Sequence, residues 1–585
     1  MVKKLMESIR EQKKNSILAM VTISGEVAFE VIIPLLMANL IDYGIDMGDM
    51  GYIVKMGIVL LLSALGQLFC GAISGKFAAI ASSGFARNLR RGMFRNIQTF
   101  SFANIDKYST AGLVTRMTTD VTNIQNAYQM MLRMSVRAPA SMIVALIMSY
   151  TINRRLANIY LIAVILLGCA LAFIMSRATK YFGEAFRKYD DLNESVQENV
   201  SAIRVVKAYV REKFEGEKFR KASENVRRLF MRAELILAWN APLMQLTVYS
   251  CILLISWIGA QLIVSSGATT FTTGDLMSML SYCMNILMSL MMLSTVFVMI
   301  TMSAASAKRV AEVLDEQSDL TNGEDPVMEV RDGSVKFDHV SFAYKKDGEK
   351  ALEDIDLDIK SGETIGIIGG TGSAKSSLVQ LLPRLYDVTE GSVTIGGVDV
   401  RRYDLDTLRN NVAMVLQKNE LFSGTIAENL RWGNPDATDA EIEDACKQAC
   451  ADEFIERFPD KYQTHIEQGG NNVSGGQKQR LCIARALLKK PRILILDDST
   501  SAVDTATDAK IRHSFAEKIP GTTVFIIAQR ISSVENADKV LVLDNGRVSG
   551  FDTPANLLKT NAIYQDVYNS QTKGSGDFDE KGGEA

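Results

Sequence analysis

Residues 364–379 read Thr-Ile-Gly-Ile-Ile-Gly-Gly-Thr-Gly-Ser-Ala-Lys-Ser-Ser-Leu-Val, which predicts an apolar strand, a glycine-rich turn and the start of a helix. In such a phosphate-binding loop (Walker A motif), backbone N–H groups of the turn and the helix amino terminus form a positive nest for phosphate. We expect Lys375 to reach the β- and γ-phosphates of a nucleotide and Ser376 to hold Mg²⁺. The predicted ATP contacts of this loop are Gly369, Gly370, Thr371, Gly372, Ser373, Ala374, Lys375, Ser376 and Ser377.

One position of the loop departs from the pattern, because Ala374 stands where the pattern has Gly. A methyl group is tolerable there if the residue has a negative φ. The surrounding Gly369, Gly370 and Gly372 remain, so we still predict nucleotide binding, with a chance glycine-rich turn as the alternative.

Two more motifs follow the loop. The run Arg-Ile-Leu-Ile-Leu-Asp-Asp-Ser at 492–499 is a hydrophobic strand that ends in two carboxylates, of which Asp497 suits the Mg²⁺ position of a Walker B strand. Before it, Asn-Val-Ser-Gly-Gly-Gln-Lys-Gln-Arg at 472–480 precedes a helix-forming run. Ser-Gly-Gly-Gln at a helix start offers N–H groups and a hydroxyl to an anion.

Length and charge predict more than one domain. At 585 residues the chain exceeds the roughly 250–300 residues of a single hydrophobic core. Residues 1–320 carry 33 Lys and Arg against 24 Asp and Glu, whereas the remaining residues carry 31 against 43. The acidic second part has no basic stripe, which argues against a protein that handles nucleic acid.

Residues 1–320 contain several stretches of roughly 20 apolar residues, the length that crosses a bilayer. Lysines and arginines precede the first span and fill the long connections after spans two and four, so the amino terminus and these connections are predicted to be cytoplasmic. Those connections read as charged helices that extend the spans into the cytoplasm. The six predicted spans run roughly from Ile17 to Ile41, Ile53 to Ser83, Met134 to Thr151, Leu156 to Ser176, Ala238 to Val264 and Leu276 to Ser306.

The order of motifs resembles that of an ATP-binding cassette (ABC), with Gln417 and the run 501–504, Ser-Ala-Val-Asp, in their expected places. With six spans in front, residues 1 to about 570 resemble a half-transporter of the bacterial multidrug-exporter type. The resemblance implies an α-helical six-span transmembrane domain fused to an α/β P-loop ATPase domain. The predicted division is 1–314 membrane domain, 315–329 linker, 330–572 ATPase domain and 573–585 disordered tail.

The resemblance also implies roles for single residues. Tyr344 would stack on adenine, Gln417 would sense Mg²⁺ and the membrane domain, and Asp504 would belong to the D-loop. Segments near Ile105 and at 205–209 would be coupling helices. In this family two cassettes meet head to tail, so the signature Ser474, Gly475, Gly476 and Gln477 would act on the ATP of the partner chain.

Two positions depart from the catalytic pattern of the family. The residue after Asp497 is Asp498 instead of Glu, which withdraws the carboxylate by roughly 1.5 Å. The switch histidine is replaced by Gln529, whose amide lacks the protonation states of imidazole. We therefore predict a site that holds ATP and hydrolyses it poorly, and a second, non-identical half-transporter that supplies the competent Walker motifs.

The substrate side of the sequence is less informative. Glu26 and Glu30 lie on one face of the first span, where a charge costs roughly 2.5 to 3.5 kcal/mol, so both are expected to face the helix bundle or a wet cavity. They contact a cationic or polar substrate or have a structural role. The leading hypothesis is an exporter half in the plasma membrane that moves hydrophobic or amphipathic compounds with ATP and Mg²⁺, in contact with membrane lipid. The alternative is a nucleotide-gated channel or regulatory membrane subunit.

Overall fold

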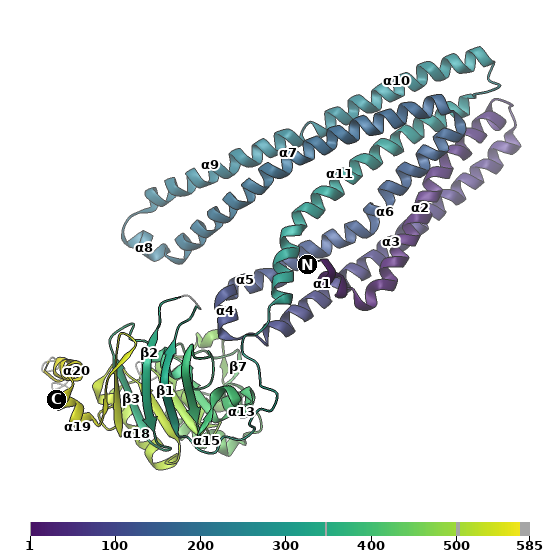
Figure 1. The fold of residues 1–585 in the computed structure, drawn as a ribbon. Coiled ribbons are helices and arrows are strands. Elements are labelled where there is room, and N and C mark those ends of the chain that lie inside the picture. The colour runs from purple at the N-terminus through teal and green to yellow at the C-terminus, as the bar shows by residue number, and fades with distance from the viewer. Residues whose placement is uncertain (1, 346–347, 499–502, 574–585) are drawn as a thin grey trace. The chain divides into compact units, whose positions relative to one another are not determined.

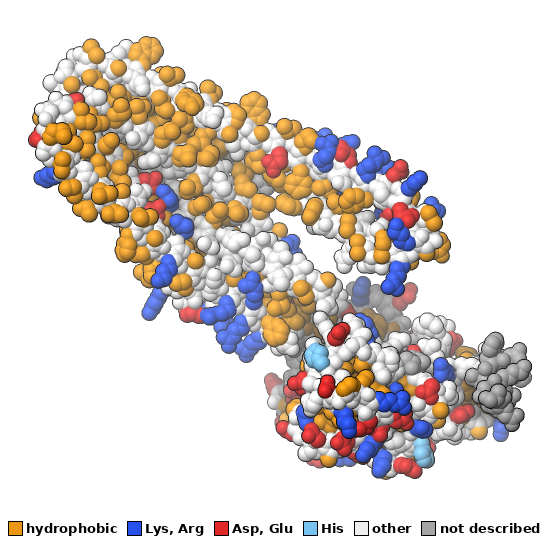
Figure 2. Space-filling view, turned by 180° about the vertical axis from the view of Figure 1, so that it is seen from behind, with side chains coloured by type: hydrophobic (Ala, Val, Ile, Leu, Met, Phe, Trp, Pro, Cys, Tyr) orange, Lys and Arg blue, Asp and Glu red, His pale blue; other side chains and the backbone are white. Residues whose placement is uncertain are grey.

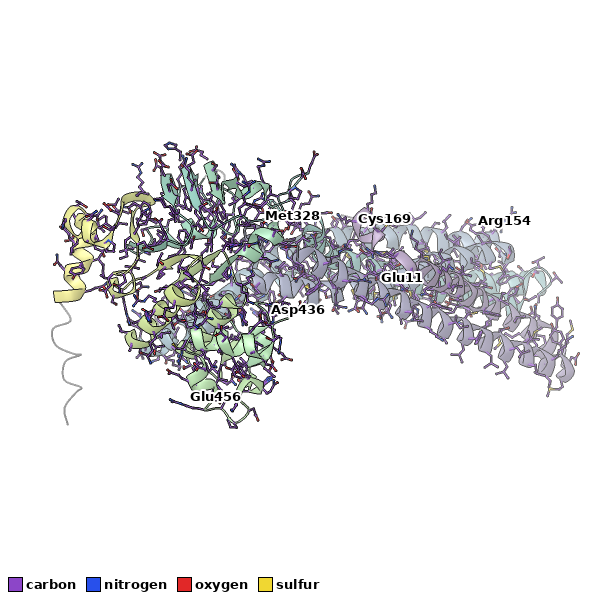
Figure 3. All side chains as sticks on the ribbon, turned by 90° about the horizontal axis from the view of Figure 1, so that it is seen from below. Glu11, Arg154, Cys169, Met328, Asp436 and Glu456 are labelled. Carbon is purple, nitrogen blue, oxygen red and sulfur yellow. The ribbon has the colours of Figure 1, made fainter. Side chains whose placement is uncertain are left out.

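The computed structural model describes residues 2–345, 348–498 and 503–573. The chain divides into two compact units, one of Met1–Thr99 and Tyr108–Gln317, the other of Phe100–Lys107 and Ser318–Ala585. Glu11, Arg154 and Cys169 mark the first unit in Figure 3, and Met328, Asp436 and Glu456 mark the second.

The first unit is helical (Figure 1). Its two longest helices begin at polar caps that satisfy free backbone N–H groups: Asp49 accepts from Gly51 and Tyr52, and Asn153 accepts from Arg155 and Leu156. Its α-helices are α1 (Val2–Glu7), α2 (Lys13–Leu40), α3 (Met50–Ile97), α5 (Thr110–Thr115), α6 (Val121–Ile152), α7 (Arg154–Ser201), α8 (Ile203–Ala208), α9 (Glu212–Leu237), α10 (Asn240–Ser266) and α11 (Thr273–Asp315).

Six helical segments of the described residues are long and apolar enough to span a membrane, which confirms the predicted number of spans. Several continue well past their apolar stretch, since α3 and α7 each have 48 residues. Hydrophobic side chains cover most of the visible face of this unit, whereas charged side chains gather around its α8 end (Figure 2). The expected charged continuations of the spans are therefore helical. The segments run Arg10–Ile45, Met50–Ile97, Thr110–Ile152, Arg154–Ser201, Glu212–Ser266 and Thr273–Asp315.

The second unit is an α/β domain with two main sheets. A four-stranded antiparallel sheet has the order β2-β1-β4-β5, and a six-stranded sheet has the order β12-β11-β3-β10-β9-β6. In the larger sheet β3, β6, β9, β10 and β11 are parallel, and only β12 is antiparallel. The strands are β1 (Val335–Phe342), β2 (Leu352–Ile359), β3 (Thr364–Gly369), β4 (Glu390–Ile395), β5 (Val398–Asp399), β6 (Val412–Val415), β7 (Gly424–Thr425), β8 (His465–Ile466), β9 (Ile493–Asp497), β10 (Thr523–Ile527), β11 (Lys539–Asp544) and β12 (Arg547–Asp552).

The central strands read as nearly continuous apolar runs because helices or sheets cover both of their faces. All five residues of β9 and of β10 are buried. The helices of this unit are α4 (Phe102–Tyr108), whose first six residues belong here, α12 (Lys375–Gln380), α13 (Leu405–Asn411), α14 (Ile426–Leu430), α15 (Asp439–Gln448), α16 (Asp452–Ile455), α17 (Gly475–Leu487), α18 (Thr505–Lys518), α19 (Pro554–Thr560) and α20 (Ala562–Lys573). The predicted tail falls almost entirely on residues 574–585, which lie outside the described residues.

Candidate functional site

The parallel sheet brings the sequence motifs together at one edge. The Walker A turn follows β3, the segment of Gln417 follows β6, Asp498 follows β9 and Gln529 follows β10. Because β6, β9, β10 and β3 are successive neighbours and run parallel, their carboxyl ends lie side by side. Ligands of open α/β sheets bind outside such carboxyl ends.

The Walker A lysine folds back on its own loop. Lys375 Nζ donates to the carbonyl oxygens of Gly369 and Gly370, each at 2.8 Å, and lies 3.3 Å from Ser373 Oγ. Burial lowers the pKa of Lys375, while the carboxylates of Asp497 and Asp498 favour its charged form. The ammonium group therefore lies over the glycine-rich turn, where it can meet a phosphate.

The sequence analysis expected the methyl group of Ala374 to be tolerated at a negative φ, and the structure does not have a negative φ there. The φ of Ala374 is +66°, in the left-handed region. An alanine there is less favourable than glycine, because its Cβ crowds the following carbonyl oxygen. The geometry of the turn, which closes just before Lys375, requires this conformation whichever residue occupies it. The loop thus keeps its shape at a conformational cost of roughly 1–2 kcal/mol.

Two of the predicted Mg²⁺ ligands meet. Ser376 Oγ donates to Asp497 Oδ1 at 3.0 Å, and Asp497 is only 4% exposed. Burial raises the pKa of Asp497, and the hydrogen bond from Ser376 opposes this shift. A hydroxyl and a carboxylate beside a phosphate nest form the hard oxygen set that Mg²⁺ prefers, so these residues fit the ion. When bound, Mg²⁺ supplies charge neutralisation for the nucleotide phosphates.

The two residues that depart from the catalytic pattern contact each other. Gln529 Nε2 donates to Asp498 Oδ2 at 2.7 Å, and Gln417 also hydrogen-bonds the Asp498 side chain. Burial raises the pKa of Asp498, and these hydrogen bonds stabilise its ionised form. The short carboxylate is thus held by two amide side chains.

Tyr344 lies two residues after β1 and is 49% exposed. Its hydroxyl is 2.8 Å from Ser377 Oγ, so the aromatic ring is tied to the helix α12 that begins with Lys375. From the sequence, only the family resemblance indicated that Tyr344 lies at the nucleotide site.

The signature begins helix α17 as expected. Ser474 caps the helix: its Oγ accepts from the Gln477 N–H at 3.3 Å, and Gln477 Oε1 accepts from the Ser474 N–H at 2.9 Å. Ser474 and Gly475 are exposed. Asp504 caps α18 by accepting from the Thr507 N–H, while Ser501 and Ala502 of the predicted D-loop lie outside the described residues.

In the helical unit, Glu26 and Glu30 of α2 share one cation. Arg137 of α6 donates to Glu26 Oε1 at 2.8 Å and to Glu30 Oε2 at 3.0 Å. Glu26 is 7% exposed, and its Oε2 has no hydrogen-bond partner among the described residues. Gly71 of α3 makes room for that carboxylate, since a Cβ there would lie 2.9 Å from Oε2. Arg137 was missed by the sequence analysis, although an arginine inside an apolar span is itself a signal of a buried ion pair.

Both units match known families. Residues 16–291 match the family described as ABC transporter transmembrane region, and residues 352–501 match the family described as ABC transporter. A membrane domain and a P-loop ATPase in one chain define a half-transporter. The chain belongs to the ABC transporter family, and its ABC ATPase domain implies ATP binding and transport driven by ATP hydrolysis.

Curated relatives match between about three quarters and nearly all of the chain. The chain is 35% identical over 554 residues to the ABC transporter ATP-binding protein YfiB of Bacillus subtilis (strain 168), covering 95% of this chain and 96% of YfiB. It is 34% identical over 430 residues, 74% of this chain and 73% of the relative, to a Bacillus subtilis (strain 168) protein named "Probable multidrug resistance ABC transporter ATP-binding/permease protein YheI".

A solved structure of a bacterial Atm1-family ABC exporter with ATP bound has the same fold. The TM-score is 0.84 with 23% sequence identity, and the match covers 96% of this chain and 99% of that chain. The expected fold class, six membrane-spanning helices followed by an ABC ATPase domain, is confirmed.

Proposed function

We propose that this chain is one half of a heterodimeric ATP-driven exporter whose own Walker site binds ATP and hydrolyses it slowly. The observation that carries the proposal is the hydrogen bond of Gln529 Nε2 to Asp498 Oδ2 at 2.7 Å. A general base must lie within about 2.6–3.2 Å of the heavy atom that carries the proton it abstracts. Asp498 is a methylene shorter than Glu and is directed toward an amide instead, so attacking water is poorly placed.

The other Walker residues support retained binding. Lys375 lies on the glycine-rich turn, and Ser376 and Asp497 hold each other in the position for Mg²⁺. Because ATP binds the closed pair of cassettes more tightly than the open pair, bound ATP favours the closed state. This effect does not require rapid ATP hydrolysis.

Exposed groups support a partner chain. Ser474 and Gly475 of the signature are open to solvent, as expected of groups that complete a site on another chain. Around α8, Val205, Tyr209 and Val210 are 56%, 74% and 79% exposed, which is unusual for apolar side chains at a charged end of a protein. A homodimer would carry Asp498 and Gln529 in both sites, so we propose that the partner is a non-identical half-transporter with intact catalytic residues.

For the transported substrate we propose hydrophobic or amphipathic compounds, moved outward across the plasma membrane with the amino terminus and ATPase domain in the cytoplasm. The name of YheI, which refers to multidrug resistance, supports this class. Glu26 and Glu30 are proposed to border the translocation cavity. With Arg137 between them the three side chains sum to one negative charge, which suits contact with a cationic group.

Two substitutions in the heterodimer test the division of roles. Asp498→Asn should reduce ATPase turnover less than twofold, whereas loss of an essential general base costs about 10² to 10⁴-fold. Gly476→Glu should reduce it more than tenfold, because a bulky anion at the start of α17 opposes the γ-phosphate of the partner's ATP. If Asp498→Asn abolishes turnover and Gly476→Glu does not, the two sites are assigned the wrong way round.

A further inference from the structure

The ring of Tyr344 is part of an aromatic cluster. It lies edge-on to Tyr386, with ring centroids 5.2 Å apart and planes at 86°, and edge-on to Phe342 at 4.8 Å and 72°. Tyr386 also contacts Phe342 at 5.6 Å. Edge-to-face pairs at these separations are favourable and directional, so Tyr386 helps to set the orientation of Tyr344.

Tyr386 is itself held by helix α4. Its hydroxyl donates to Asp106 Oδ2 at 2.8 Å, and its ring contacts Phe102, with centroids 6.1 Å apart. Phe102 and Asp106 are four residues apart on α4 and thus on one face of that helix. Burial raises the pKa of Tyr386, which keeps the hydroxyl protonated as a donor. Residues Phe100–Lys107 lie between α3 and α5 in the sequence yet group with the ATPase unit.

Tyr344 is consequently fixed at two points. Its hydroxyl meets Ser377 on the phosphate-binding helix, and its ring packs nearly at a right angle to the ring of Tyr386, while about half of the residue stays exposed. The free part is available to a flat ligand group such as a nucleotide base. Phosphates are bound elsewhere, by the glycine-rich turn and Lys375.

We propose that Asp106 and Tyr386 are positioning residues for base recognition, which act through the Tyr344 ring. The inference rests on ATP binding at this Walker site, as in the proposed function, and on the role that the family resemblance implies for Tyr344, stacking on the adenine of ATP. Helix α4 then affects binding of the base and not of the triphosphate.

The test compares ATP with inorganic triphosphate, a probe without base or sugar, on the full-length chain in lipid nanodiscs with Mg²⁺. Asp106→Ala and Tyr386→Phe should weaken ATP about three- to tenfold, as expected for loss of one hydrogen bond, and triphosphate less than twofold. Asp106→Asn keeps an acceptor oxygen and should bind ATP within twofold of the unaltered chain. Asp436→Ala, at an exposed carboxylate of the same unit, is the matched control.

The outcomes separate this inference from the proposed function. Tyr344→Ala should weaken ATP and spare triphosphate; if it leaves ATP unchanged, the adenine contact itself is wrong. If Tyr344→Ala weakens ATP but Asp106→Ala and Tyr386→Phe do not, only the positioning role is overturned. Equal weakening of ATP and triphosphate by Asp106→Ala also overturns it, because that result indicates a general loss of structure.

Discussion

Restoring the family's catalytic residues should turn the slow site into a fast one. We consider the double variant Asp498→Glu with Gln529→His in the chain purified without a partner. Glutamate advances the carboxylate by about 1.5 Å. However, Gln529 Nε2 lies 2.7 Å from Asp498 Oδ2 and would still hold a longer carboxylate, so both residues must change. Misplacement by 1 Å costs about 10²-fold, and a placed general base contributes about 10² to 10⁴-fold.

We therefore expect the double variant to raise phosphate release by about 10²-fold, and Asp498→Glu alone to raise it less than tenfold. The assay is steady-state phosphate release in nanodiscs at saturating ATP. Adding Lys375→Ala to the double variant should abolish the gain, which shows that it arises in this Walker site. An unchanged rate in the double variant, with ATP still bound, would refute the view that Asp498 and Gln529 limit hydrolysis.

Three other predictions follow from single observations. Ala374→Gly relieves a left-handed alanine (about 1–2 kcal/mol) but adds unfolded-state entropy (about 0.4–1 kcal/mol). Denaturant unfolding of the ATPase unit should therefore show a net gain between about 0 and 1.6 kcal/mol, and destabilisation would contradict the φ of +66°. Arg137→Ala leaves the buried Glu26 and the partly buried Glu30 without their cation and should lower thermal stability in detergent, by about 3–5 kcal/mol if both stay ionised. A chain of unchanged stability would exclude the shared ion pair. The double variant Glu26→Gln with Glu30→Gln should reduce transport of cationic dyes more than transport of neutral dyes. A triple variant that adds Arg137→Gln controls for the arginine left without a partner. Equal loss of transport for all dyes in the double and the triple variant would assign the glutamates a structural role.

Local pattern and the family resemblance were enough for the fold class, and local pattern was enough to expect the Walker residues at one edge of a sheet. A turn after an apolar strand, and carboxylates at the end of another, lie at the same edge of a parallel sheet whatever the intervening chain, so Ser376 and Asp497 were expected to meet. The six spans were predictable for a similar reason, because bilayer thickness sets a length of apolar sequence that is easily recognised.

The sequence did not predict which side chains from distant segments pair, or the φ angle of Ala374. Asp106 and Tyr386 are 280 residues apart, and although the family resemblance implied a coupling helix near Ile105, it did not indicate this pair. The helical period placed Glu26 and Glu30 on one face of α2 but not opposite Arg137, since that depends on which helix packs there. At Ala374 the closure of the turn determines φ, and the residue type only determines the cost.

The division of labour between the two ATP sites is tested most directly by a comparison of two ATPase rates. One is the rate of this chain alone and the other is the rate of its complex with a non-identical half-transporter, both in nanodiscs at saturating ATP and Mg²⁺. We predict that the chain alone binds ATP but turns it over at least about 10²-fold more slowly than the complex, in line with the contribution of a placed general base. Full, substrate-stimulated hydrolysis by the chain alone would contradict both the slow site and the need for a different partner.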